Sequence, residues 1–408
     1  MPNCRRVMIR GPRLGSGCQE YSRFLLAFLV LSPLSAAVAD PSSGTTPFIL
    51  DANRMYAELT FIRPDGTLHK TLAFVDLGSP SMILAQALFQ ELQLDQKKPL
   101  TFYVGKMAVQ VEASKVTSDT WLPFSIGDNR RVEALLPAGV MDRYGVAIDY
   151  AHRTLTLAMP GILKPAGIPL PCRVDEKTGL VVVNVGVSGR LYPITIDNGS
   201  AYTWLRKATV QEWFAVHPRW KRGIGAVGAS NMRMADDGIE ATGILVRIEE
   251  IKLGSLHLRK VGALAIGPSS SNWDFIDWYS RKNPVAVIGW LGGNVLQGFR
   301  ITIDYPNRMT YWLAQTELDS NDLDQVGLTL RSTGSEYFVA GVVTQNAQPT
   351  VEGIQPGDKL LQVDGLRTDG ATASAVLSAL HGKPGESRTL LLQRDSSRFT
   401  VQARVVSF

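Results

Sequence analysis

Val75-Asp76-Leu77-Gly78-Ser79 and Ile196-Asp197-Asn198-Gly199-Ser200 are two versions of one short pattern in this chain. Each version places an aspartate at the end of an apolar run and follows it with one variable residue and then Gly-Ser. An offset of 121 residues joins the two aspartates, and the same offset joins Gln90-Glu91 to Gln211-Glu212. A repeat on this scale predicts two related structural units in series.

A second match closes each unit. Residues 144–155 and 299–310 both contain an aromatic residue, an alternating strand pattern and Asp-Tyr-x-x-Arg, which predicts a strand, a turn and a return strand. The offset here is 155 residues, so the second unit holds about 34 additional residues. Short β-type runs broken by Gly, Asp and Asn occur throughout, and they favour a mainly β protein.

These patterns divide the chain into segments. We expect a first unit over residues 40–162, a second unit over 163–316, a polar linker over 317–326 and a module of different character over 327–408. The chain has 408 residues, of which 45% are apolar and 19% charged, as in ordinary globular proteins. Its length is sufficient for two or three domains with buried cores.

The N-terminal 39 residues are typical of a secretory signal peptide. A basic region precedes the apolar run Phe24 to Leu31, and Ala37-Val38-Ala39 is a small-x-small cleavage site. A membrane anchor is the alternative, but the apolar run is short for a span and Pro33 interrupts its end. We therefore expect an exported protein without a stable membrane span after cleavage.

Charge and cysteine content exclude several classes of function. Of the net charge of +5, +4 lies in the first 39 residues, so the remainder offers no electrostatic basis for binding nucleic acid. Cys172 is the one cysteine beyond the signal peptide, so we expect no internal disulfide. The five histidines are scattered without metal-ligand spacing, and we expect no metal and no cofactor.

Two matched aspartates can carry chemistry that one cannot. A single Asp-x-Gly-Ser is usually a turn, but two units related by a pseudo-twofold axis would bring Asp76 and Asp197 together. Two adjacent carboxylates share a proton, so one can activate a water while the other polarises a carbonyl group.

The flanking residues of each pattern suit this role. Gly78 and Gly199 would allow the tight turn, and the hydroxyls of Ser79 and Ser200 would orient the carboxylates by hydrogen bonds.

On these residues the chain resembles the aspartic proteases of the pepsin and retropepsin type, over roughly residues 50–315. Val287-Ile288-Gly289 is similar to the second hydrophobic-hydrophobic-Gly box of that family. Gly223, Gly225 and Gly228 are similar to its glycine-rich flap, although a flexible loop would look the same. The resemblance implies a bilobal fold of β-barrel lobes and endopeptidase activity on peptides or proteins, with Asp76 and Asp197 as the catalytic pair.

The chain also departs from the family pattern. Leu77 and Asn198 stand where the family usually has Thr or Ser, whose hydroxyl ties the two lobes together beneath the catalytic pair. The first unit has Leu135-Leu136-Pro137-Ala138-Gly139 where a regular apolar-apolar-Gly box is expected. A catalytically inactive peptide-binding protein with the same cleft is therefore the alternative hypothesis.

The C-terminal module resembles a PDZ domain of the kind found in exported bacterial proteases. The resemblance rests on the run Gly353 to Gly365, which includes Gln-Pro-Gly-Asp and ends at Asp-Gly. It implies that Tyr337, Phe338 and Val339 supply the strand that pairs with a C-terminal peptide ligand. Alternatively, the module packs on the protease and binds nothing. The PDZ resemblance and the lack of disulfides favour a Gram-negative periplasm over full secretion.

Overall fold

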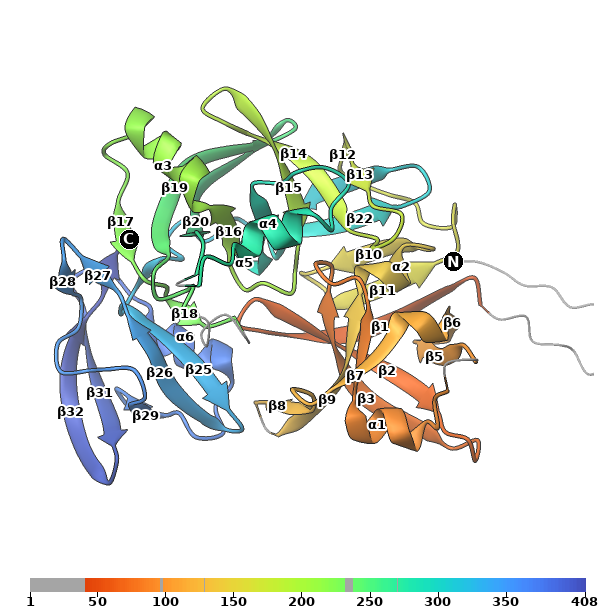
Figure 1. Cartoon of the computed structure of the whole chain (residues 1–408), viewed down its shortest axis with the longest axis horizontal. Coiled ribbons are helices and arrows are strands. Elements are labelled where there is room, and N and C mark those ends of the chain that lie inside the picture. The colour runs from red at the N-terminus through yellow and green to blue at the C-terminus, as the bar shows by residue number, and fades with distance from the viewer. Residues whose placement is uncertain (1–40, 96–97, 128, 232–237, 270) are drawn as a thin grey trace, which may run out of the picture. The chain divides into compact units, whose positions relative to one another are not determined.

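The structure is a computed structural model that describes residues 41–95, 98–127, 129–231, 238–269 and 271–408. The predicted signal peptide over residues 1–39 lies outside these described residues. Within them the chain is mainly β, as the sequence predicts, with 33 strands and six α-helices (Figure 1). In this part of the chain we find no helix with the length and apolar character needed to cross a membrane.

The first unit, described from residue 41 to 162, consists of short strands with two brief helices. Its elements are β1 Ser43–Asp51, β2 Arg54–Ile62, β3 Leu68–Asp76, β4 Met82–Ala85, α1 Gln86–Glu91, β5 Leu100–Val104, β6 Met107–Val111, β7 Val116–Asp119, β8 Phe124–Ile126, β9 Arg130–Pro137, α2 Ala138–Met141, β10 Gly145–Asp149 and β11 Thr154–Ala158.

The second unit, residues 163–316, repeats this order with additional elements after the aspartate. Its elements are β12 Ile168–Pro171, β13 Arg173–Val174, β14 Val181–Val187, β15 Arg190–Ile196, β16 Thr203–Arg206, α3 Lys207–Val216, β17 Arg222–Ile224, β18 Gly228–Ala229, β19 Ile244–Leu253, β20 Leu256–Ile266, α4 Phe275–Ser280, β21 Gly289–Leu291, α5 Gly293–Leu296, β22 Phe299–Asp304 and β23 Met309–Ala314.

The repeat in sequence is also a repeat in strand pairing. In the first unit β3, which ends at Asp76, runs parallel to β9, and β4 pairs antiparallel with the same β9. In the second unit β15 runs parallel to β21, and β16 pairs antiparallel with β21. Each aspartate therefore follows a strand whose position is fixed by the same three-strand arrangement.

The strand register changes which residue of the first unit corresponds to Gly289. Leu84 lies opposite Ala134 and Leu205 lies opposite Gly289, so the counterpart of Gly289 is Ala134. Gly139 instead lies in α2, the counterpart of α5. Gly289 has a φ of +146°, and a Cβ there would lie 2.0 Å from the carbonyl oxygen of Trp204, which explains a glycine at this position.

The two units meet along strands β10 and β22. These strands pair antiparallel, with Ala147 opposite Thr302 at the centre of the register. Because the offset between the units is 155 residues here, Ala147 pairs with its own counterpart. The sheet order β12-β23-β22-β10-β11-β1 is accordingly symmetric, and a pseudo-twofold axis passes between the two central strands.

Residues 317–408 contain the C-terminal module and the segment that leads into it. The elements are β24 Asp324–Gln325, β25 Leu328–Thr333, β26 Glu336–Val342, β27 Thr344–Gln345, β28 Gln348–Pro349, β29 Lys359–Val363, β30 Leu366–Arg367, α6 Ala373–Leu380, β31 Ser387–Arg394, β32 Ser397–Arg404 and β33 Val406–Ser407. Buried side chains such as Leu330, Leu360 and Leu390 form a core that is distinct from the core of the two units.

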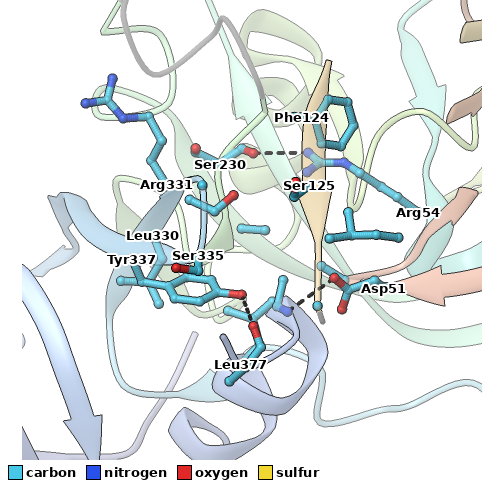
Figure 2. A pocket seen from close by; sticks show the side chains of 18 of the residues that line it. Asp51, Arg54, Phe124, Ser125, Ser230, Leu330, Arg331, Ser335, Tyr337 and Leu377 are labelled. Carbon is cyan, nitrogen blue, oxygen red and sulfur yellow. Dashed lines mark hydrogen bonds between the residues drawn. The ribbon is translucent and has the colours of Figure 1, made fainter. Parts of the chain in front are cut away.

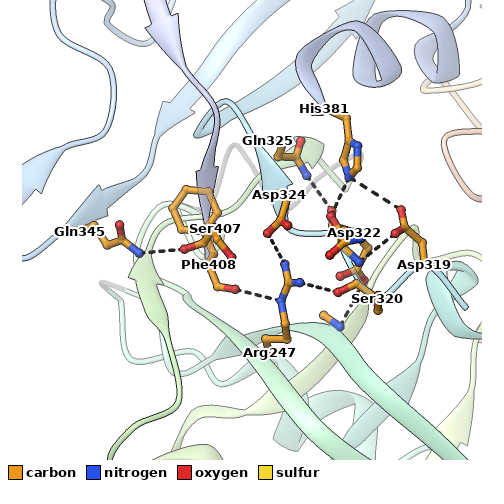
Figure 3. A network of polar contacts seen from close by, with 12 residues as sticks. Arg247, Asp319, Ser320, Asp322, Asp324, Gln325, Gln345, His381, Ser407 and Phe408 are labelled. Carbon is orange, nitrogen blue, oxygen red and sulfur yellow. Dashed lines mark hydrogen bonds and ion pairs between the residues drawn. The ribbon is translucent and has the colours of Figure 1, made fainter. Parts of the chain in front are cut away.

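The stretch predicted as a linker, residues 317–326, is held by hydrogen bonds (Figure 3). Arg247 on β19 donates to the carbonyl oxygens of Ser320 and Phe408, and it forms an ion pair with Asp324 at 2.8 Å. Leu323 is fully buried. Because its polar groups are bonded to both the second unit and the module, this stretch is a packed connection.

Candidate active site

Asp76 and Asp197 lie side by side across the pseudo-twofold axis, and their carboxyl groups share a side-chain hydrogen bond. Each pattern's glycine abuts the opposite carboxyl group. A Cβ placed on Gly78 would lie 2.3 Å from Asp197 Oδ2, and one on Gly199 would lie 2.4 Å from Asp76 Oδ1. Any larger residue at either position would collide with a carboxyl group, so the close approach requires both glycines.

Backbone N–H groups orient the two carboxyls in the same way. Gly78 donates to Asp76 Oδ1 at 2.8 Å, and Gly199 donates to Asp197 Oδ1 at 2.9 Å. The backbone N–H of Ser200 also donates a hydrogen bond to the Asp197 carboxyl group. Donors aimed at both carboxyls hold their planes towards each other.

The predicted role of the two serine hydroxyls is wrong. Ser79 Oγ donates to the carbonyl oxygen of Ser81 at 3.4 Å, and Ser200 Oγ donates to that of Tyr202 at 2.7 Å. A hydroxyl has a single proton to donate, so these two stabilise the turns after the aspartates instead of bonding the carboxylates.

Burial raises the pKa of both carboxyl groups, and it does so unequally. The pKa of Asp197 lies well above its usual range because the side chain is 7% exposed and faces the negative charge of Asp76. The pKa of Asp76 is also raised by burial, although the Gly78 N–H, the hydrogen bond from Asp197 and the charge of Arg54 oppose the rise. The pair therefore holds one proton preferentially on Asp197, while the partly exposed Asp76 is the group that ionises.

Leu77 and Asn198, the variable residues of the two patterns, form a one-sided contact beneath the pair. Asn198 Oδ1 accepts a hydrogen bond of 2.8 Å from the backbone N–H of Leu77. Asn198 Nδ2 in turn approaches the sulfur of Met55 at 3.2 Å. Both Leu77 and Asn198 are buried, so an amide on one side and packing on the other connect the two units here.

Arg54 is a site residue that sequence analysis missed. It follows a two-residue turn, Ala52-Asn53, in which both residues have positive φ as in a type I′ hairpin. Its Nε donates to the carbonyl oxygen of Gly199 at 3.2 Å, and its Nη2 donates to that of Ser230 at 3.1 Å (Figure 2). A single arginine at the start of a strand has no local pattern that distinguishes it from a surface residue.

Tyr279 on α4 is a second residue without a sequence signal. It is 4% exposed. Burial, followed by the charges of Asp197 and Asp76, raises its pKa well above the usual range. A neutral, buried hydroxyl therefore lies close to both carboxyls.

The predicted flap glycines lie near the C-terminal module. The atoms nearest to a Cβ on Gly223 belong to Phe408 and Val343, and Gly225 is also closest to Val343. Gly228 has a φ of +80° and lies against the ring of Tyr202. Strand β17, which contains Gly223, pairs with β27 of the module.

The prediction that Tyr337, Phe338 and Val339 supply the strand that pairs with a peptide ligand is wrong. These residues lie on β26, which is hydrogen-bonded to β25 on one side and to β29 on the other. A strand with both edges paired cannot accept a further strand. The Tyr337 side chain does line a cavity, where its hydroxyl donates to the carbonyl oxygen of Ala371 at 2.8 Å (Figure 2).

Within the described residues, no group of three or more His, Cys, Asp or Glu side chains could hold a metal ion. The thiol of Cys172 is buried, which raises its pKa to about 12 and makes it unreactive. The acidic pair is thus the arrangement of titratable groups with the clearest chemical use.

No family model matches the chain, and no curated protein is similar to it in sequence.

Proposed function

We propose that this protein is an aspartic endopeptidase of the pepsin and retropepsin type, with Asp76 and Asp197 as its catalytic pair. One observation carries the proposal: the two carboxyls share a hydrogen bond, and each contacts the glycine of the opposite pattern. Two turns that happened to have similar sequences would have no reason to meet in this reciprocal way.

The unequal environments assign a role to each carboxyl. Asp76, ionised, takes a proton from a water whose oxygen attacks the carbonyl carbon of the scissile peptide bond. Asp197, protonated, gives its proton to the carbonyl oxygen, and a tetrahedral diol results. Asp76 then delivers its proton to the leaving nitrogen as the C–N bond breaks. A diol hydroxyl returns its proton to Asp197, which restores the starting state.

The proposal extends to the rest of the chain. The C-terminal module is a PDZ domain that recruits protein substrates or partners, and the protein is exported to a Gram-negative periplasm. The separate core of the module supports the first statement, and the signal-like N-terminal sequence supports the second.

Isosteric substitution tests the catalytic pair. We expect Asp76→Asn and Asp197→Asn each to reduce cleavage of a mixed peptide library by roughly 100- to 10,000-fold between pH 3 and 7, measured by mass spectrometry. Asp395→Asn is the matched control, because Asp395 is exposed and has a positive φ that Asn also tolerates.

Two outcomes would contradict the proposal. Cleavage that survives both substitutions would exclude the pair as the catalytic groups. A wild-type protein that is folded by circular dichroism, binds library peptides and cleaves none would favour the inactive peptide-binding protein.

A further inference from the structure

One edge of the C-terminal module's sheet is covered by residues of the second unit. Strand β18 runs parallel to β25, with Gly228 opposite Thr329 and Ala229 opposite Leu330. Directly after β18, the N–H of Ser230 donates to the carbonyl oxygen of Leu330 at 2.8 Å. The chain thus supplies its own edge strand to the module.

The contact is made by main-chain groups and small side chains. Gly228, Ala229 and Ser230 present little side-chain volume, and the pairing depends on backbone N–H and C=O groups that every peptide has. An edge strand of a sheet is a general template for such pairing. The occupant of this edge therefore has the chemistry of an extended peptide with small residues.

The edge of β25 extends beyond the docked residues. A cavity of about 160 Å³ is lined by β25 and α6 on one side and by residues of the β1–β2 hairpin and of β8 on the other (Figure 2). Arg331 and Ser332 on β25, Ser335 after it, and Leu377 on α6 line this cavity beside Ser230. A longer strand would find room here that residues 228–230 leave unused.

Arg54 connects the docked residues to the aspartate pair. Its two hydrogen bonds go to the carbonyl oxygen of Ser230, in the docked segment, and to that of Gly199, whose N–H bonds the Asp197 carboxyl group. The side chain of Arg54 is 8% exposed, so a lost hydrogen bond is not replaced cheaply by solvent. Movement of Ser230 therefore changes the position of a buried cation next to the pair.

We propose that residues 228–230 are an internal ligand of β25, and that an extended segment of a partner protein displaces them and thereby releases Arg54 from one of its two anchors. The exchange of strands is independent of catalysis. Its effect on cleavage rests on the proposed function.

The direction of the effect follows from charge. The cation of Arg54 favours the ionised form of Asp76, so it lowers the pKa of that group. When the docked segment leaves and Arg54 moves away, the ionised form of Asp76 loses this electrostatic stabilisation. The pKa of Asp76 therefore rises. Since Asp76 must be ionised to act as the base, the acid limb of the pH–rate profile moves to higher pH as well.

A peptide of the chain's own residues 224–230, Ile-Gly-Ala-Val-Gly-Ala-Ser, is the probe for the exchange. Labelled with fluorescein, it competes against the tethered segment, whose effective concentration is in the millimolar range. We expect weak binding to the wild-type protein by fluorescence anisotropy and at least tenfold tighter binding to Ser230→Pro, which lacks the N–H bonded to Leu330. The same peptide carrying Ser230→Pro is the matched control and should not bind.

A second variant guards against misfolding of Ser230→Pro. Glu240 Oε1 accepts the N–H of Asn231, which anchors the segment outside the probe's sequence. Glu240→Ala should therefore loosen the internal ligand without altering β25, and raise probe affinity several-fold. Equal affinity in wild type and both variants, or no binding to any of them, would overturn the exchange of strands.

An activity-independent measurement tests the coupling. In protein labelled with ¹³C-aspartate, the Asp76 carboxyl signal is assigned by its loss in Asp76→Asn. Its titration midpoint should move to higher pH when a probe shortened to residues 224–229, which lacks the Ser230 carbonyl oxygen that anchors Arg54, saturates Ser230→Pro. An unchanged midpoint with saturated probe would overturn the coupling through Arg54, whether or not the protein cleaves peptides.

Discussion

Asn198 and Leu77 show how two different residues fill equivalent positions. The amide oxygen of Asn198 accepts the N–H of Leu77 across the boundary between the units. The leucine side chain, 1% exposed, offers only packing in return. One hydrogen bond therefore replaces the reciprocal pair that hydroxyls at both positions would form.

The bond to Leu77 should contribute measurably to stability. Asn198→Ala leaves the buried N–H of Leu77 without its acceptor, and we expect the free energy of unfolding to fall by about 1–3 kcal/mol. Urea unfolding followed by fluorescence measures the change. Asn307→Ala, at a turn outside the contact between the units, serves as the control. A loss no larger than that of the control would mean that packing alone joins the units here.

At this scale the sequence predicts the acidic pair but not its surroundings. Asp76 and Asp197 stand out because their patterns match at a constant offset. Arg54 and Tyr279 come from outside these patterns, and their positions depend on how a hairpin and a helix fold back towards the pair. The pattern predicts that the serine hydroxyls bond the carboxylates, but the turn geometry directs them to carbonyl groups.

Helix α6 depends on a residue of the first unit. Asp51, at the end of β1, accepts hydrogen bonds from the N–H groups of Ser374 at 2.6 Å and Ala373 at 3.2 Å (Figure 2). The side chain of the helix's own N-cap, Thr372, accepts from the N–H of Ala375. A carboxylate at a helix N-terminus satisfies unpaired donors and complements the helix dipole.

Removal of this carboxylate should loosen the first turn of α6. For Asp51→Ala we expect a loss of about 1–3 kcal/mol in the free energy of unfolding and faster amide hydrogen exchange at Ala373 and Ser374. Asp51→Asn retains one acceptor and should show a smaller effect. Exchange rates that stay at the wild-type value in Asp51→Ala would show that solvent replaces the cap.

The sequence predicts which segments form strands, but not the order of those strands in a sheet. The alternating patterns predict β structure, and the two offsets predict the repeat. They do not say which strand of the C-terminal module lies at an edge, because β25 and β26 have similar apolar patterns. The pairing of β26 with both β25 and β29 depends on contacts between distant residues.

Two buried acids outside the Asp76–Asp197 pair affect the whole molecule. Burial raises the pKa of Glu240 from 4.5 to about 8, although the N–H of Asn231 and the charge of Arg54 oppose the rise. Burial also raises the pKa of Asp322 from 3.8 to about 6 against hydrogen bonds from Asn294 and Gly262. Each group has an oxygen without a partner among the described residues.

Stability should therefore decrease as the pH rises. The folded state holds protons that the unfolded state has released between about pH 4 and pH 8, so the free energy of unfolding falls across this range. Glu240→Gln should remove the decrease between about pH 5 and 8, and Asp322→Asn that between about pH 4 and 6. Urea unfolding at each pH measures both, and curves parallel to the wild-type curve would contradict the assignment.

Contacts between distant segments are the least predictable feature at this scale. Asp51 and Ser374 lie 323 residues apart, and no periodicity or motif connects them. Likewise, no periodicity or motif connects Ser230 with Leu330, although a backbone hydrogen bond joins them. Such contacts are chosen by the shapes of folded surfaces, whereas sequence patterns report the environment of single segments.

The pairing of Ala147 with its own counterpart Thr302 is the geometry of a strand that meets a second copy of itself. If two separate identical chains met in this way, every position would have to suit both sides at once. Covalent fusion removes that restriction, because each half can mutate alone. The two halves differ in this way: one donates through a leucine's backbone and the other accepts through an amide, and Asp76 is partly exposed while Asp197 is buried. One continuous chain thus permits the two halves to take different roles.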